Sequence, residues 1–410
     1  MTTPLSHIRV LDMSRILAGP WAAQTLADLG AEVIKIERPG TGDDTRAWGP
    51  PFIVDSMGNL TKESAYFLSA NRGKKSLALD ISKPEGQEIL RKLVISSDVL
   101  IENYKKGGLS QYGLGYDDLK KINPAIIYCS ITGFGQTGPF SNRAGYDFLI
   151  QAMGGLMSVT GEPDGKPGAG PQKIGVALTD ILTGLYTNIA ALSALAQRER
   201  SGKGCHIDMS LLDVTTASMA NQAMNFLVTG EVPNRMGNAH PNIVPYEAFE
   251  ASDQFLIVAV GNDSQFERFV EVAGHAELAK DERFVTNAAR VKNRDILIPI
   301  IQNFMKERNS NEWIDELEKV GVPCGPINNL KQVFEHPQVK ERGMQIELSH
   351  PLAGLVPQVA NPINFVGEKL EYQGAPPTLG QHTEEILKEI LKLGKKEILS
   401  LKNAGIVGTS

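Results

Sequence analysis

Residues 8–37 read IRVLDMSRILAGPWAAQTLADLGAEVIKIE, and this stretch decides the fold. An apolar strand over 8–13 leads through a turn into a helix over 21–30, which Gly30 ends. A second strand follows over 32–36. Two strands joined by a helix through such short connections are typical of a parallel pair with a crossover helix. The stretch therefore predicts the start of a parallel sheet.

The same alternation continues along the chain. The pattern predicts an α/β fold with a Rossmann-like large domain, in which ligands bind at the carboxyl ends of parallel strands. The further predicted strands cover 76–81, 98–101, 125–131 and 206–209, and the predicted helices cover 84–96, 147–160 and 211–228. A glycine- and proline-rich loop over 161–175 precedes a long helix, whose apolar stripe is Ile181, Leu185, Ile189, Leu192 and Leu195.

The character of the sequence changes near residue 230, and a smaller α+β domain is predicted there. Its strands cover 246–250 and 255–260, and its helices cover 264–273, 292–306 and 310–320. We divide the chain into a first part of the large domain (1–205), a linker (206–235), the small domain (236–322), and a linker with the C-terminal part of the large domain (323–410). A helix over 383–393 belongs to the last part.

Composition limits the classes of protein that fit. The 410 residues include 41 Lys and Arg against 47 Asp and Glu, a net charge of −6, which disfavours a nucleic-acid-binding protein. No apolar run approaches about 18 residues, so no membrane span or membrane partner is expected. The first residues lack a secretory signal pattern, and three scattered cysteines suit a reducing cytoplasm. None of the seven histidines forms a metal-binding motif, so no metal site is expected.

The first strand–turn–helix leaves the ligand open. It carries one glycine, Gly19, and not the GxGxxG pattern of nicotinamide enzymes, which counts against an NAD(P)-dependent oxidoreductase. The second strand ends in Glu37 and Arg38. An acidic residue there suits the ribose diol of NAD, whereas an arginine suits a phosphorylated ribose, which NADP and coenzyme A both carry.

Asp180 stands at the start of the long helix. Free N–H groups and the helix dipole stabilise a carboxylate at that place as the anion, so we expect Asp180 to stay ionised at neutral pH. An ionised carboxylate can act as a nucleophile. The same position also suits a helix N-cap with no chemical role.

Long segments of the sequence resemble the class III coenzyme A transferases, the family of formyl-CoA transferase, carnitine CoA-transferase and α-methylacyl-CoA racemase. The resemblance runs from about residue 6 to about residue 390, and the segments at 321–339 and 379–391 are most similar to the succinyl-CoA:glutarate CoA-transferase branch. The segments that carry it include residues 11–46, ANRGKKSLALD (70–80), residues 101–119, YCSITGFGQTGP (128–139), residues 145–161 and VALTDILTGL (176–185).

The resemblance implies an enzyme that moves CoA from an acyl-CoA to a free carboxylic acid, here a short dicarboxylate such as glutarate or succinate. It implies that Asp180 is the catalytic residue and forms an aspartyl-CoA thioester. Acyl-CoA is then a substrate, and no permanently bound cofactor is expected. The family also implies an interlocked homodimer built from large and small domains, and the loop over 161–175 suits a lid that excludes water.

The family's CoA contacts fall on matching positions of this sequence. They are Arg15, Ile16, Ala18, Arg38, Asn71, Arg72, Lys75 and Asn103. Gln111, Thr132 and Leu17 depart from formyl-CoA transferase, which has an arginine, a lysine and a glutamine at these places. The first two departures alter the expected phosphate clamp, and the third makes oxalate a doubtful acceptor.

Residues that recognise the acceptor are predicted from charge, because a distal carboxylate needs a cation. The candidates are Arg46, Arg143, Arg235 and His240, with Trp48 as a wall of the pocket and Tyr146 as a further substrate residue. Tyr146 stands in GYD, where racemases of the family have the histidine that abstracts a proton. A tyrosine with a pKa near 10 is a poor base at neutral pH, so a racemase is the weaker alternative. A binder of acyl-CoA without catalysis is a further alternative.

Overall fold

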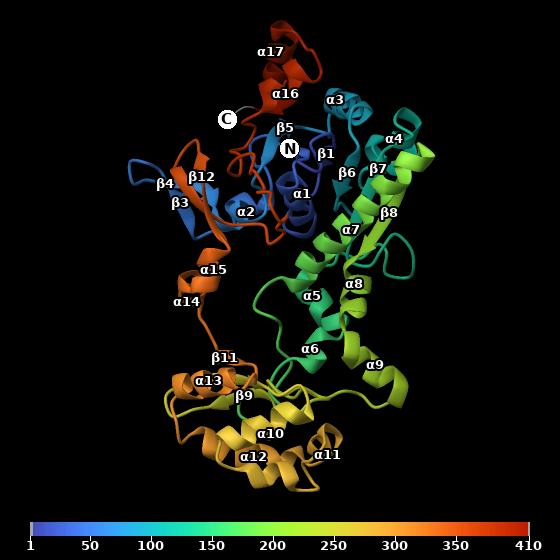
Figure 1. Ribbon diagram of the computed structural model, residues 1–410. Helices are drawn as coiled ribbons and strands as arrows, with labels where there is room; N and C mark the ends of the chain where they lie inside the picture. The colour runs from blue at the N-terminus through green and yellow to red at the C-terminus, as the bar shows by residue number, and fades with distance from the viewer. Residues whose placement is uncertain (1–2, 409–410) are drawn as a thin grey trace. The chain divides into compact units, whose positions relative to one another are not determined.

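The computed structural model describes residues 3–408 (Figure 1). The chain packs as two compact units. Residues 3–156, 174–223 and 337–408 form the large unit, and residues 157–173 and 224–336 form the small unit. The large unit is therefore assembled from three separate stretches of the sequence.

A seven-stranded sheet forms the centre of the large unit, in the order β14-β5-β2-β1-β6-β7-β8. Neighbours from β5 to β8 pair in parallel, which confirms the predicted parallel sheet. The short strand β14 (Val407–Gly408) was not foreseen and pairs antiparallel with β5 (Lys74–Leu79). From β1 (Arg9–Asp12) the chain builds first toward β5 and then toward β8, so the strand order reverses between β1 and β6 (Val99–Glu102). Ligands of doubly wound sheets bind at such a reversal.

Helices cover both faces of this sheet, because successive side chains of a strand point to opposite faces. In β1, Val10 packs with α1 (Ala18–Asp28) and α7 (Leu178–Ser201), whereas Leu11 packs with α3 (Pro84–Ile95) and α16 (Thr383–Glu389). Figure 1 shows α3 and α16 apart from α1 and α7. The two apolar layers together hold the carboxyl ends of the strands in fixed positions.

The long helix α7 packs through an unexpected face. Of its predicted apolar stripe, Ile189 is 60% exposed and Leu185 is 41% exposed. The buried face carries small and hydroxyl residues such as Thr183 and Thr187. Small residues let α7 approach α1 closely: a Cβ on Gly184 would lie 2.7 Å from the carbonyl oxygen of Ala18. By length and composition alone α7 could cross a membrane, but it packs against α1, α8 (Leu211–Ser218) and the sheet of this unit.

Two predicted helices are broken in the structure. The helix predicted over 147–160 ends as α5 at Met153 and restarts as α6 (Leu156–Val159), because Gly155 adopts a φ of +87° that cannot continue an α-helix. The helix predicted over 211–228 is divided into α8 and α9 (Ala220–Thr229) at Ala220, whose φ is +42°. Two hairpins were missed, and these are β3 (Phe52–Val54) with β4 (Leu60–Ser64) and β12 (Gln345–His350) with β13 (Gly354–Val359).

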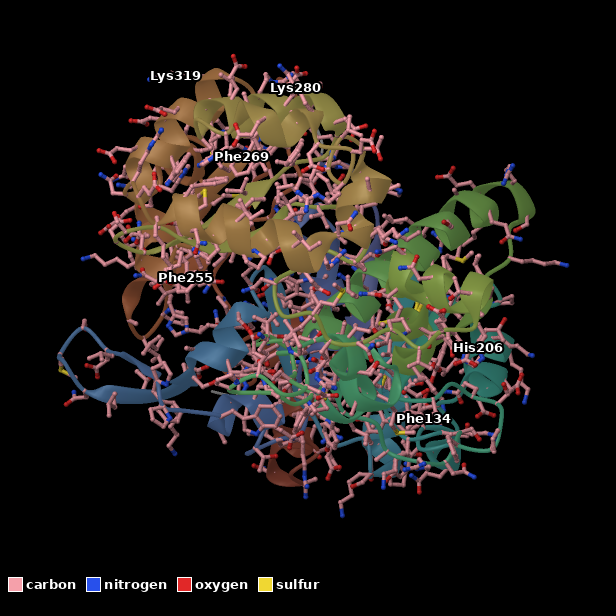
Figure 2. The ribbon with its side chains drawn as sticks, turned by 90° about the horizontal axis from the view of Figure 1, so that it is seen from below. Phe134, His206, Phe255, Phe269, Lys280 and Lys319 are labelled. Atoms are coloured by element: carbon pink, nitrogen blue, oxygen red, sulfur yellow. The ribbon has the colours of Figure 1, made fainter. Side chains whose placement is uncertain are left out.

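The small unit has an antiparallel sheet in the order β11-β10-β9 with helices packed on it. Its core includes Phe269, Phe304 and Trp313, all nearly fully buried. Figure 2 shows Phe269 inside this unit and the lysines Lys280 and Lys319 on its outer side. Its own apolar core makes this unit a folded body in its own right.

The remaining elements of the large unit are β2 (Glu32–Glu37), β7 (Ile127–Thr132), β8 (Cys205–Ser210), α2 (Ala65–Ser69), α4 (Tyr116–Ile122), α5 (Asp147–Met153), α15 (Pro337–Glu341) and α17 (Lys395–Asn403). Short 3-10 helices cover Asp44–Ala47 and Ser110–Tyr112. The elements of the small unit are β9 (Tyr246–Glu250), β10 (Phe255–Ala259), β11 (Cys324–Pro326), α10 (Asp263–Val272), α11 (Asn287–Lys292), α12 (Arg294–Met305), α13 (Ser310–Lys319), α14 (Leu330–Glu335) and the 3-10 helix Ala276–Lys280.

Candidate active site

A cavity of about 160 Å³ opens at the carboxyl ends of β1, β6 and β7, at the reversal of strand order. The turn after β1, the loop after β6 and the segment before α5 form its walls, and Asp180 lies in it. We call it the Asp180 cavity. Its lining residues are Arg15 to Ala18, Asn103 to Lys106, Ile131 to Gly133, Ser141 to Tyr146, Asp180 and Leu211.

Asp180 is a residue of the first turn of α7 but is not its N-cap. The N-cap position is Ala177, which gives no side-chain hydrogen bond. Instead, Asp147 at the start of α5 accepts the N–H of Thr179 at 2.9 Å and that of Asp180 at 3.4 Å. The alternative that Asp180 is only the N-cap of α7 is therefore wrong. The Asp147 carboxylate accepts the N–H groups at the start of α7, and Asp180 lines the cavity.

The expectation that Asp180 is fully ionised at neutral pH does not hold, because its pKa is raised. Burial raises the pKa of Asp180, and the nearby Asp147 carboxylate raises it further, to about 7. Desolvation and a like charge both disfavour the anion, and here they outweigh the helix dipole. A partly buried carboxyl group with a raised pKa inside a cavity is typical of a functional site.

Two aromatic residues border the same region. Burial, together with the carboxylates of Asp180 and Asp147, raises the pKa of Tyr66 to about 12, so this tyrosine stays a neutral hydrogen-bonding group. Trp48 packs edge-on against the Tyr66 ring with centroids 5.2 Å apart and is 44% exposed. Trp48 itself does not line the Asp180 cavity. Sequence reasoning missed Tyr66, which no motif distinguishes from a core aromatic residue.

A second cavity of about 390 Å³ lies beside the first, and Arg15 and Tyr104 line both. Arg38 lies on its wall at the end of β2. The neighbouring Glu37 has no free oxygen for a ribose diol, because it accepts hydrogen bonds from Arg46 at 2.7 and 2.9 Å, from the Asp43 N–H and from the Ser76 hydroxyl. This second cavity therefore suits a phosphorylated ribose better than the diol of NAD.

Several residues predicted to bind ligand are used inside the protein instead. Arg46 is 6% exposed and forms a buried ion pair with Glu37 and a contact of 2.9 Å with Glu63. Arg72 is paired with Asp28 and also donates to the carbonyl of Val359. Most N–H groups of these two guanidiniums are bonded inside the protein, which disfavours a role of Arg46 in binding the acceptor and of Arg72 in binding CoA. Both assignments stay predictions.

The other predicted contacts divide between the cavities and elsewhere. Arg15, Ile16, Ala18, Asn103 and Tyr146 line the Asp180 cavity, together with the departures Leu17 and Thr132. Asn71 is buried and bonded to Phe67 and Lys74, Lys75 pairs with Glu32 and Glu385, and Gln111 bonds to Gly108. None of these last three lines either cavity.

Arg235 and His240 belong to the small unit. Arg235 pairs with Asp164 and donates to the carbonyl of Glu162, and His240 accepts the N–H of Asn242. Residues 161–173 of the glycine-rich loop belong to the same unit, where Gly237 donates to the Gly161 carbonyl. A lid function of this loop stays a prediction.

The cations that do reach the Asp180 cavity are Arg15, Lys105, Lys106 and Arg143. Arg143 is exposed, and its guanidinium lies over the ring of Phe140 at 4.6 Å. Sequence reasoning missed both lysines, although the KK pair directly follows the strand that ends in Glu102. A chain with a net charge of −6 thus has a positive cavity, which suits an anionic ligand.

Metal-ligating side chains do not gather in the described residues 3–408, where no group of three or more His, Cys, Asp or Glu could hold a metal ion. No histidine lines the Asp180 cavity within the same range. A proton abstraction by histidine, as in the racemase alternative, therefore has no base at this site.

Comparison with known proteins identifies relatives over nearly the whole chain. The profile of the family described as CoA-transferase family III matches residues 5–383. A succinate–glutarate CoA-transferase of Agrobacterium fabrum is 49% identical over 388 residues, 94% of this chain and 96% of that protein. A human succinyl-CoA:glutarate CoA-transferase is 45% identical over 98% of this chain and 90% of that protein. The crystal structure of a CAIB/BAIF family protein from Brucella suis is 52% identical, covers 95% of this chain and 100% of that one, and superposes with a TM-score of 0.82.

Proposed function

The chain belongs to CoA-transferase family III, and from this premise we propose that it transfers CoA from an acyl-CoA such as succinyl-CoA to a short dicarboxylate such as glutarate. The observation that carries the proposal is the partly buried Asp180 carboxyl group in a cavity lined by cations, at the reversal of strand order in a mainly parallel sheet. The named relatives supply the choice of substrates.

The first half of the reaction consists of two nucleophilic attacks, which convert the donor thioester into an aspartyl-CoA thioester. The ionised Asp180 carboxylate attacks the thioester carbonyl, the C–S bond breaks, and the CoA thiolate leaves behind a mixed anhydride. The thiolate then attacks the Asp180 carbonyl carbon, and the donor acid leaves as a carboxylate. The product is an aspartyl-CoA thioester. Both intermediates keep the energy of the original thioester, provided that water is excluded.

The second half reverses these steps with a new acid. The acceptor carboxylate attacks the aspartyl thioester, CoA leaves as the thiolate, and the thiolate attacks the acceptor's carbonyl carbon in the second anhydride. Asp180 is released as a carboxylate and the new acyl-CoA departs. No net proton or electron is consumed, so no permanent cofactor is needed for this sequence.

The two adjoining cavities suit the length of acyl-CoA. The second cavity, with Arg38, takes the phosphorylated adenosine. The pantetheine arm then runs along Arg15 and Tyr104, which line both cavities, toward Asp180. Arg143 is our candidate for the distal carboxylate of the acceptor, since guanidinium binds a carboxylate with two parallel hydrogen bonds.

A homodimer is also part of the proposal. The outward face of α7 exposes Leu185, Tyr186 and Ile189, and α5 exposes Phe148 nearby in the same unit. Apolar side chains that gather on one surface favour a protein partner, and in this family a second copy of the chain is the expected one.

The experiment that tests the function combines activity with trapping. Succinyl-CoA and glutarate should give glutaryl-CoA and succinate, and hydroxylamine added with succinyl-CoA alone should modify Asp180, which peptide mass spectrometry locates. Asp180→Asn should keep its circular dichroism and lose transfer. Near-normal turnover by this variant, or a label on another residue, would refute the assignment.

A further inference from the structure

The turn after β1 is strained. Ile16 has a φ of +73°, in the left-handed region that a β-branched side chain disfavours. The turn lies where the two cavities meet: Ile16 lines the Asp180 cavity, Ser14 lines the second cavity, and Arg15 lines both. Such backbone persists only where surrounding groups impose it.

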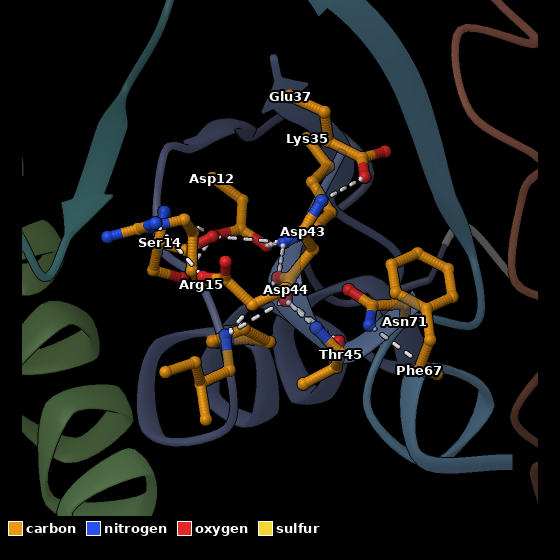
Figure 3. A network of polar contacts seen from close by, with 12 residues as sticks. Asp12, Ser14, Arg15, Lys35, Glu37, Asp43, Asp44, Thr45, Phe67 and Asn71 are labelled. Atoms are coloured by element: carbon orange, nitrogen blue, oxygen red, sulfur yellow. Dashed lines mark hydrogen bonds and ion pairs between the residues drawn. The ribbon is translucent and has the colours of Figure 1, made fainter. Parts of the chain in front are cut away.

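A buried ion pair between Lys35 and Asp43 holds the backbone of this turn in its conformation. The Asp43 carboxylate accepts the Ile16 N–H, with both oxygens at 3.2 Å, and pairs with Lys35 at 2.9 Å. Lys35 also donates to the carbonyl of Ser14 at 2.9 Å. Both charged side chains are fully buried. Figure 3 shows Lys35 and Asp43 beside the segment of Ser14 and Arg15.

Further groups fix the pair and the turn. Thr45 donates to Asp43 from its N–H at 2.9 Å and from its hydroxyl at 2.8 Å, which orients the carboxylate. On the other side, Asn103 accepts the Arg15 N–H at 2.9 Å and donates to the Arg15 carbonyl at 2.7 Å. The close contact of Gly19 with Ser14, where a Cβ would lie 2.3 Å from the Ser14 side chain, leaves the turn little room to move.

We propose that Asp43, held by Lys35 and Thr45, is a positioning residue for acyl-CoA, which fixes the Ser14–Ile16 turn in the shape that joins the two cavities. The inference rests on the proposed function, because it takes the ligand that spans these cavities to be acyl-CoA. A buried ion pair is seldom the most stable filling of a core, so its presence directly beneath a strained ligand-facing turn indicates a role in geometry.

The expected kinetic signature follows from where the turn lies. CoA stays bound through every step of the transfer, so the turn contacts it equally in ground and transition states. Loss of such uniform binding raises KM and leaves kcat nearly unchanged. A purely structural role would instead lower the fraction of folded enzyme, which lowers kcat and leaves KM unchanged.

The test is Asp43→Asn, measured by steady-state kinetics and by calorimetric binding of free CoA. We expect the KM for the acyl-CoA donor and the Kd for CoA to rise at least tenfold, with kcat within about threefold of wild type and an unchanged KM for the acceptor acid. The matched control is Asp98→Asn. Asp98 also pairs with a cation, Arg198, and also accepts a backbone N–H, that of Arg9. It precedes β6 and so lies at the opposite end of the sheet.

A double-mutant cycle separates positioning from stability. Glycine adopts a φ of +73° without strain, so in an Ile16→Gly background the same Asp43→Asn change should raise the KM for the donor by less than about threefold. Should Asp43→Asn fail to fold, Thr45→Val removes only the orienting hydroxyl, and a smaller rise in the same KM is expected.

Three results distinguish the outcomes. If Asp43→Asn, or Thr45→Val in its place, lowers kcat while the donor KM and the CoA Kd stay at wild-type values, the positioning role is wrong. An equal loss in the Ile16→Gly background overturns it as well. Wild-type enzyme that neither binds CoA nor transfers it would overturn the proposed function itself, together with this inference.

Discussion

Replacement of Asp147 by asparagine should move the pH dependence of the reaction. Asp180 must be ionised to attack, and its pKa of about 7 lies well above the ordinary 3.8. The activity of wild-type enzyme at low donor concentration should therefore rise through pH 7 and fall tenfold for each unit below it. Asp147→Asn removes the like charge and keeps an oxygen that can accept the Thr179 N–H.

The size of the effect follows from the two causes of the raised pKa. The total shift of about 3 units corresponds to roughly 4 kcal/mol at about 1.4 kcal/mol per unit. Burial is the larger cause and Asp147 the smaller, so the variant should lower the pKa of Asp180 by less than half of the shift, on the order of 1 unit. At pH 6 Asp180 is then ionised in roughly a tenth of the wild-type molecules and in roughly a half of the variant molecules. The activity at pH 6, expressed as a fraction of each enzyme's own plateau, should therefore be about fivefold higher in the variant.

The assay is kcat/KM for succinyl-CoA from pH 5 to 9, with each profile scaled to its own plateau so that a change in maximal rate does not enter. Asp117→Asn is the matched control, because it also removes a first-turn carboxylate, from α4. A wild-type acid limb near pH 4, or an Asp147→Asn limb at the wild-type position, would refute the electrostatic argument.

Four further changes have defined outcomes. The folded chain favours the neutral form of Asp180, so ionisation of this group destabilises the fold increasingly from pH 4 to pH 7 and fully above pH 7. In urea unfolding at pH 8, Asp180→Asn should therefore be more stable than wild type by up to about 4 kcal/mol. At pH 4 the two proteins should differ little. Arg46→Met leaves buried carboxylates unpaired and should lower the free energy of unfolding by about 3–5 kcal/mol in the same urea assay. Refolded Ile189→Glu should give less of the dimer of twice 44.5 kDa in light scattering than wild type refolded in the same way, because interlocked subunits assemble as they fold. An equal yield of dimer would show that Ile189 is not at the interface. Arg143→Gln should raise the KM for glutarate about tenfold and leave the KM for a monocarboxylic acid of equal length unchanged. An equal effect on both KM values would show that Arg143 does not bind the distal carboxylate.

The sheet could be predicted from the sequence because its signals are local. Short apolar strands and the glycine that ends α1 set the alternation, and every predicted strand of the parallel sheet is present. The family resemblance placed Asp180 in a segment that lines a cavity. What the sequence did not reveal was the electrostatics of this residue, because Asp147 comes from another helix 33 positions away.

Side-chain partners were predicted least well. The stripe of Ile189 and its neighbours has the right helical period, but periodicity does not say which face is covered. Arg46 is indistinguishable in the sequence from a ligand-binding arginine, and only the fold brings Glu37 and Glu63 to it. Nothing in the sequence predicts the positive φ of Ile16, because a β-branched residue disfavours the left-handed conformation.

The antiparallel strand β14 has a consequence for how the protein folds. Its residue Val407 pairs with Leu79, so the edge of the central sheet is covered only when two segments far apart in the sequence meet. Until they meet, β5 presents unpaired backbone groups to other chains. Contacts so distant along the chain also slow folding. Substitutions that prevent β14 from pairing should therefore increase aggregation during refolding.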